Sequence, residues 1–275
     1  MPLVYHSGTP AAAVWFPQLA DAVSKAGLKL VTYSRPGYAS STPMPGRSVA
    51  DAAGDVTGIL DALDADQFVA LGWSGGGPHA LACAAALADR CAAAATIAGV
   101  APYPAEGIDW MAGMGQDNVD EFSAAFAGTE TLEPFLEKSA AELSEVHGPE
   151  VAESLRTLVS DVDKRALTGD FAEMLAEAFR RSVSSGIAGW RDDDLAFIRS
   201  WGFDLGAIRR PVAVWQGGQD RMVPFAHGGW LAQHIPNAQV HLYPEEGHLS
   251  LAVASVERIV TDLAALGKAA SATRR

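Results

Sequence analysis

Short apolar runs alternate with amphipathic stretches over the first hundred residues of the chain. The runs of strand length are PLVY, LKLVTY, QFVALGW and AAAATIAGV. Between them, residues 17–26, 48–63 and 77–88 repeat their apolar positions at helical spacing. Strands that alternate with helices indicate right-handed crossovers and a parallel sheet.

The last third of the chain returns to this pattern. The strands PVAVWQGG and AQVHLYP are each followed by a helical pattern, over residues 225–235 and 249–266. Residues 1–101 and 206–275 are therefore predicted to form one α/β core, a mostly parallel sheet flanked by helices.

Residues 102–205, between these two parts, show no convincing strand. Apolar stripes at helical spacing are separated by Gly and Pro, as at Gly148-Pro149. Asn118 and Glu121 have the spacing of a capping box at a helix start. An all-helical insertion in an α/β chain predicts a cap or lid over one edge of the sheet.

Composition excludes several classes of partner. The chain has 275 residues, and its 33 acidic side chains outnumber its 20 basic ones. This charge disfavours binding to nucleic acid or to an anionic membrane surface. Cys83 and Cys91 lack a metal-binding spacing, and MPLVYHSGTP lacks the features of a signal peptide. We expect reduced thiols, no metal site and a cytoplasmic protein.

The strongest chemical signal is a serine between a strand and a helix. The residues from Gly72 to Gly76 read GWSGG and satisfy the pattern G-x-S-x-G, with Ser74 at its centre. This turn lifts a nucleophilic hydroxyl above the carboxyl end of its strand. The pattern alone is weak, since a glycine-rich turn can simply join two elements, but here a predicted strand and a predicted helix flank it.

A serine hydroxyl needs a base, and that base needs an acid to orient it. The motif predicts the chain order Ser, Asp or Glu, His. Asp220 and His248 follow the two strands of the last third, so both should lie with Ser74 at the carboxyl edge of the sheet. Glu245 and Glu246 are rival acids that would need a different loop geometry.

The remaining histidines are weaker candidates for the base. We expect His79 to point away from the site and His227 and His234 to lie on a helix surface. The others are His6 beside the first glycine loop, His147 in the insertion and His241 on a strand.

These motifs resemble the α/β-hydrolase superfamily, specifically its lid-bearing serine hydrolases. The resemblance covers nearly the whole chain and is weakest in the insertion; it rests on HSGTP, SRPGYASS, GWSGGG, GGQDRMVP and EEGHLS. It implies an oxyanion hole made by the backbone amides of Thr9 and Gly75, and no metal or organic cofactor. Ser7 stands where the family usually has a histidine, and Ser34 where an aspartate is common.

Family members usually have two strands before the HSGTP loop, which here begins within the first ten residues. We therefore expect a fold that lacks the first two strands, with LKLVTY as an exposed sheet edge. We hypothesise that a second copy of the chain, in a homo-oligomer, or the C-terminus covers this edge.

The resemblance implies an esterase-like enzyme that cleaves a small, apolar ester or related acyl substrate. Trp73 and Trp110 are candidate substrate-binding residues. One alternative is an aminopeptidase similar to proline iminopeptidases, which would need an acidic group in the insertion to hold a substrate ammonium. The acidic residues considered there are Glu106, Glu173 and Asp192 to Asp194, all expected to be solvated. A second alternative is a non-catalytic ligand-binding protein of this fold.

Overall fold

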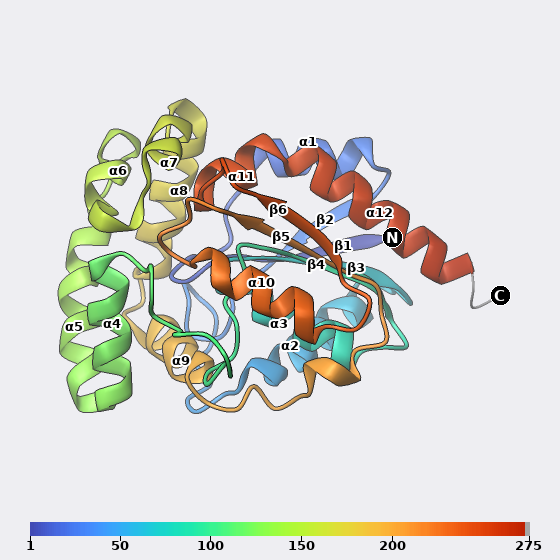
Figure 1. Cartoon of the computed structure of the whole chain (residues 1–275), viewed down its shortest axis with the longest axis horizontal. Coiled ribbons are helices and arrows are strands. Elements are labelled where there is room, and N and C mark those ends of the chain that lie inside the picture. Colours follow the sequence, from blue (N-terminus) through green and yellow to red (C-terminus); the bar gives the residue numbers. More distant parts are fainter. Residues whose placement is uncertain (273–275) are drawn as a thin grey trace.

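A computed structural model describes residues 1–272 and contains one six-stranded, fully parallel sheet (Figure 1). The strand order is β2-β1-β3-β4-β5-β6. Their bounds are Pro2–His6 for β1, Lys29–Thr32 for β2, Phe68–Trp73 for β3, Cys91–Ile97 for β4, Val212–Gly217 for β5 and Gln239–Tyr243 for β6. The predicted α/β fold with a parallel sheet is confirmed.

Helices cover both faces of the sheet because the central strands are apolar on both sides (Figure 1). In β3, Phe68 and Ala70 pack into one hydrophobic cluster, whereas Val69 and Leu71 pack into the other. The first cluster includes residues of α2 (Ala52–Ala62), α3 (Gly76–Ala86) and α10 (Phe225–His234). The second includes residues of α1 (Pro17–Lys25), α11 (His248–Ala254) and α12 (Val256–Ala272).

Residues 102–205, called the helical segment below, contain helices and no strand. Figure 1 shows α4 to α8 gathered at one end of the sheet, and α9 contacts α4 and α5. The bounds are Gln116–Ala127 for α4, Thr129–Leu143 for α5, Val151–Ser154 for α6, Asp161–Ala166 for α7, Gly169–Ser182 for α8 and Ala188–Phe197 for α9. Short 3-10 helices lie at Val49–Asp51, Gly148–Glu150, Arg156–Leu158 and Leu205–Ala207.

Two local predictions were wrong. Asn118 lies inside α4, whose N-cap is Gly115, and its side-chain amide donates to the Met222 carbonyl. It therefore ties the helix to the loop after β5 instead of capping it. The predicted C-terminal helix is two helices, α11 and α12, interrupted at Ser255.

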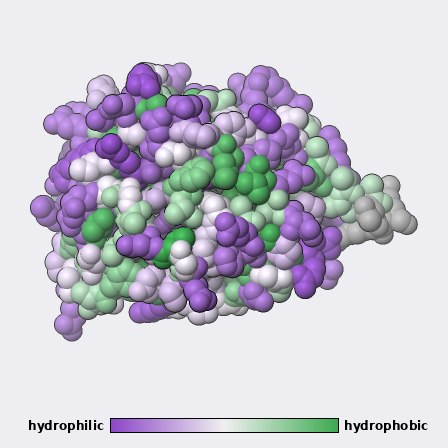
Figure 2. Space-filling model, in the orientation of Figure 1, coloured by the Kyte–Doolittle hydropathy of each residue, from purple (hydrophilic) through white to green (hydrophobic). Residues whose placement is uncertain are grey.

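The two edge strands, β2 and β6, keep partly exposed side chains. Val240 and Leu242 of β6 are among the exposed large apolar residues. Figure 2 shows a mostly hydrophilic face with small hydrophobic patches across its middle. The C-terminal helix α12 contacts β3, β4 and α1, so it covers a face of the sheet rather than the β2 edge. Coverage of that edge by a second copy stays a prediction.

No helix within residues 1–272 combines the length and the apolar character that crossing a membrane requires.

The helical segment packs closely on the core at Gly189 of α9. The Gly189 amide donates to the Gly37 carbonyl at 3.2 Å, and a Cβ atom on Gly189 would lie 2.7 Å from the Tyr38 ring. Gly189→Ala should therefore lower the free energy of unfolding in urea by about 1–3 kcal/mol through overpacking. Gly58→Ala, at an open position of α2, is the control and should be neutral or stabilising. Equal stability of the two variants would contradict this close contact.

Candidate active site

Ser74 occupies a strained turn between β3 and α3. Its φ is 55°, in the left-handed region, and its amide donates to the Ile97 carbonyl at 2.8 Å. A Cβ atom on Gly72 would collide with the Gly76 carbonyl, and one on Gly76 would collide with the His6 carbonyl. The glycines are thus required because three backbone segments meet at this turn, as the G-x-S-x-G pattern predicts.

Asp220 and His248 form a buried hydrogen-bonded pair. The distance from His248 Nδ1 to Asp220 Oδ2 is 2.8 Å, and both side chains are almost fully buried. Asp220 Oδ1 accepts from the amides of Met222 and Val223, each at 2.8 Å, and Oδ2 also accepts from Gln216 Nε2 at 3.1 Å. The carboxylate is therefore held by four donors and in turn fixes the imidazole.

The electrostatics of His248 favour the charged imidazolium. Burial alone would lower the pKa of His248, but the nearby carboxylates of Asp220 and, more weakly, Asp163 raise it above its ordinary value. A base with a raised pKa accepts a proton readily.

Several residues of the predicted site line one cavity of about 300 Å³. Ser74 and His248 both line it, with Gly8, Thr9 and Gly75. Among the described residues the Ser74 hydroxyl and the imidazole share this cavity without a hydrogen bond between them. Such contacts are often long in unliganded enzymes and shorten when substrate binds.

The amides of Thr9 and Gly75 are both available to a ligand. The two residues touch, since a Cβ atom on Gly75 would collide with the Thr9 side chain. No acceptor within residues 1–272 binds either amide. Gly75 also precedes the first turn of α3, where the helix dipole favours negative charge.

The two tryptophans considered for substrate binding differ in their surroundings. Trp73 lines the cavity, and its ring stacks on His248 with the centroids 5.8 Å apart. Trp110 does not line it. Its indole donates to the Ala101 carbonyl and packs edge-on against Phe122, so the structure places it in the packing of the helical segment.

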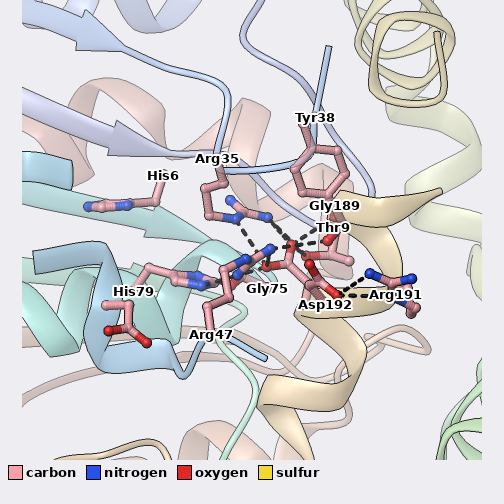
Figure 3. A network of polar contacts seen from close by, with 12 residues as sticks. His6, Thr9, Arg35, Tyr38, Arg47, Gly75, His79, Gly189, Arg191 and Asp192 are labelled. Atoms are coloured by element: carbon pink, nitrogen blue, oxygen red, sulfur yellow. Dashed lines mark hydrogen bonds and ion pairs between the residues drawn. The ribbon is translucent and has the colours of Figure 1, made fainter. Parts of the chain in front are cut away.

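A buried ion network supports the loop that carries Thr9. Asp193 of α9 accepts from Arg35, Arg47, Tyr38 and Thr9. Arg35 also donates to the Ser7 and Gly8 carbonyls, at 2.5 and 2.9 Å. Figure 3 shows Arg35, Arg47, Tyr38 and Thr9 pointing toward one another beside α9. Burial alone would raise the pKa of Asp193, but the two guanidinium groups hold it far below its ordinary value.

Asp192 to Asp194 were expected to be solvated, and all three are buried. Asp192 pairs with Arg191 at 2.9 Å, Asp193 with the two core arginines, and Asp194 lines the cavity. Of the three, Asp193 packs toward the core, which supplies its two arginines.

The structure corrects the prediction for His227 and shows the surroundings of His79. His227 is fully buried, accepts from the Ala101 amide at 3.1 Å and lies 2.7 Å from the Trp110 carbonyl, so it is not a helix-surface residue. His79 is also buried, with its Nδ1 2.8 Å from the Gly75 carbonyl. Burial, with the positive charge of Arg35, keeps the pKa of His79 well below its ordinary value. His79 therefore packs beneath the serine turn as a neutral imidazole.

Asp163 of α7 is a site residue that the sequence did not reveal. Its buried carboxylate accepts from the amides of His248, Leu249 and Ser250, at 3.2, 2.8 and 3.0 Å. It also accepts from the hydroxyl of Ser160, the N-cap of its own helix, at 2.8 Å. One carboxylate of the helical segment thus fixes the first turn of α11, the turn that carries His248. The pattern Ser160-x-x-Asp163 is a capping-box spacing, but it gives no sign of the distant partner.

Within the described part of the chain, no group of three or more His, Cys, Asp and Glu side chains is arranged to hold a metal ion.

A family model described as "alpha/beta hydrolase fold" matches residues 1–254. The chain belongs to the alpha/beta hydrolase fold family. The resemblance inferred from the motifs is thereby confirmed, and the match spans the core and the helical segment together.

Curated relatives of this chain are hydrolases. A 2-hydroxy-6-oxononadienedioate/2-hydroxy-6-oxononatrienedioate hydrolase of Cupriavidus pinatubonensis is 27% identical over 90% of this chain and 79% of its own length. A pimeloyl-[acyl-carrier protein] methyl ester esterase of Chromobacterium violaceum is 24% identical over 78% of this chain and 74% of its own length. This similarity supports a hydrolase of this fold.

Solved structures share the fold. An esterase from Thermogutta terrifontis superposes with a TM-score of 0.67 at 18% identity, covering 98% of this chain and 90% of its own. An enol-lactonase from Burkholderia xenovorans superposes with a TM-score of 0.66 at 18% identity, covering 96% and 90%.

Removing the Asp163 carboxylate should destabilise the protein and loosen His248. Asp163→Ala leaves three buried amides without an acceptor, so we expect the free energy of unfolding to fall by at least about 1–3 kcal/mol. Asp163→Asn keeps one acceptor oxygen and should lose less. Asp161→Asn, on the exposed side of the same helix, is the control and should change stability by under about 0.5 kcal/mol. Urea unfolding measures all three, and a neutral Asp163→Ala would refute the structural role.

Proposed function

We propose that the protein is a serine hydrolase in which Ser74, His248 and Asp220 act as a catalytic triad on a carboxylic ester or related acyl bond. The observation that carries this proposal is the buried His248–Asp220 hydrogen bond beside a cavity that also holds Ser74 on a strained turn. A turn that merely joined a strand to a helix would not need an oriented imidazole at the same cavity.

The reaction would follow the acyl-enzyme route. His248 accepts the proton of the Ser74 hydroxyl as its oxygen attacks the substrate carbonyl, and Asp220 stabilises the imidazolium. The Thr9 and Gly75 amides donate to the resulting oxyanion, and the imidazolium then protonates the leaving alcohol. Water, deprotonated by His248, attacks the acyl-enzyme and releases the acid, which restores the Ser74 hydroxyl.

The position of the helical segment beside the cavity supports a role as a cap that shapes the substrate pocket. It supplies much of the cavity wall, including the apolar side chains Met114, Phe122, Phe135, Leu175 and Phe197. A cavity of about 300 Å³ suits a small molecule. The name of the Chromobacterium violaceum relative describes a methyl ester esterase, which favours an ester over other acyl bonds.

A fluorophosphonate probe should label one residue of the native protein, Ser74. Ser74→Ala should abolish labelling and reduce p-nitrophenyl ester hydrolysis on the order of 10³-fold or more, with His248→Ala and Asp220→Asn losing comparable, non-additive amounts. Ser123→Ala, whose hydroxyl lies on exposed α4 surface, is the matched control and should label normally. Labelling that persists in Ser74→Ala would exclude Ser74 as the nucleophile.

The pH dependence should report the raised pKa of His248. The base works only when neutral, so kcat/KM should fall as pH drops through a midpoint above about 6.5, the ordinary imidazole value. The negative charge of Asp163 helps to raise this pKa, and Asp163→Asn should move the midpoint to lower pH. A midpoint below about 6.5 in the native protein, or a shift to higher pH in the variant, would contradict this electrostatic description.

A further inference from the structure

The cavity wall contains carboxyl groups that the proposed mechanism does not use, among them Glu121 and Asp194. Glu121 projects from α4 and Asp194 from α9, and both line the cavity that holds Ser74. Asp194 is only 1% exposed, and Glu121 keeps part of its surface at the cavity. The two carboxyls are near enough for the charge of Glu121 to act on Asp194.

Few groups compensate the charge of this pair. Trp190 Nε1 donates to Glu121 Oε1 at 2.7 Å. No donor of the described residues reaches the buried Oδ2 of Asp194. Burial, and for Asp194 also the adjacent Glu121 charge, raises the pKa of both carboxyls.

The nearby cations are engaged elsewhere or lie in solvent. Arg35 and Arg47 bind Asp193, which neighbours Asp194 on α9 but faces the core loop. Arg156, on the cavity wall, pairs with Asp117 and Glu142. Lys138 also lines the cavity but is exposed. Within residues 1–272 the carboxyl pair therefore has no ion-pair partner of its own.

An uncompensated buried acid is costly, and much of the surrounding wall is apolar. A ligand cation would supply the missing charge, and an ammonium group could donate to several carboxyl oxygens at once. We propose that the Glu121–Asp194 pair binds the ammonium group of an amine-bearing ester or amide whose acyl carbon is attacked by Ser74. This inference rests on the proposed hydrolase function and specifies its substrate class.

The pair also predicts which substrates are rejected. Two carboxyls on the cavity wall disfavour a substrate carboxylate beside them and leave it without a partner. The curated hydrolases similar to this chain include several named for dioates, which are dianions. We therefore expect this protein to disfavour dicarboxylates.

The experiment compares p-nitrophenyl esters of ω-aminoalkanoates with those of alkanoates of equal chain length, over a series of lengths. At the best length, the amino ester should have a kcat/KM at least roughly tenfold higher, the effect of one charge-assisted interaction. The double variant Glu121→Gln/Asp194→Asn should bring this ratio close to one while alkyl esters are still hydrolysed. Glu142→Gln removes a cavity-wall carboxyl that is already paired with Arg156, and it should keep the ratio. Equal ratios in the native protein and the double variant would overturn the proposal, as would native preference for the alkyl esters.

A binding measurement separates this inference from the proposed catalysis. Calorimetry with Ser74→Ala protein should show n-hexylammonium binding at least about tenfold tighter than n-hexanol, and the added Glu121→Gln/Asp194→Asn changes should remove the difference. Failure of ester hydrolysis with retained ammonium binding would reject the triad and keep the cation site. Hydrolysis that depends on Ser74, without ammonium binding, would reject the cation site alone. If the double variant unfolds, the single variants Glu121→Gln and Asp194→Asn carry the same comparison.

p-Nitroanilides of the same amino acids determine the bond type. Cleavage of the anilides at rates comparable to the esters would assign an aminopeptidase-like activity, and cleavage of the esters alone would assign an esterase. In both outcomes the preference for the amine must depend on Glu121 and Asp194 for the proposal to stand.

Discussion

The buried carboxylate of Asp193 is the contact on which the geometry of the site depends. It joins α9 of the helical segment to two arginines of the core, and one of these arginines holds the carbonyls of the loop that carries Thr9. A buried carboxylate with two guanidinium partners has a strong directional preference, and loss of either side leaves uncompensated charge. The position of the loop beside Ser74 is therefore coupled to the docking of the helical segment. Asp163 makes a second link of the same kind to the turn that carries His248.

The local sequence pattern was sufficient to predict the strands of the core and the position of the candidate site. Short apolar runs, separated by turn residues, predict the strands β1 to β6. The same pattern places Ser74, Asp220 and His248 after the carboxyl ends of β3, β5 and β6. Such runs predict strands well because a central parallel strand is buried on both faces and contains few polar residues. The ends of the helices in the helical segment were harder to predict, because contacts determine these helices as much as intrinsic propensity does. The misassigned capping box at Asn118 is an example.

The contacts between distant segments could not be predicted. Asp163 binds amides 85 to 87 positions away, and Arg35 reaches Asp193 over 158 positions. Read alone, each of these acidic residues looks like part of a solvated helix. His227 was misread for the same reason, because the backbone groups that bury it come from residues 101 and 110. Only the packing of helices against the core shows which acidic residues lose solvent and what compensates them.

The proposed mechanism requires that Ser74 carry the acyl group during turnover. The most direct measurement is peptide mass spectrometry of the protein quenched within milliseconds of mixing with a p-nitrophenyl ester. We expect one acyl adduct, on the peptide containing Ser74, formed together with a burst of p-nitrophenol equal to the enzyme concentration. Ester turnover with an adduct on another residue, or with no adduct and no burst even for slowly hydrolysed acyl groups, would contradict the proposed mechanism.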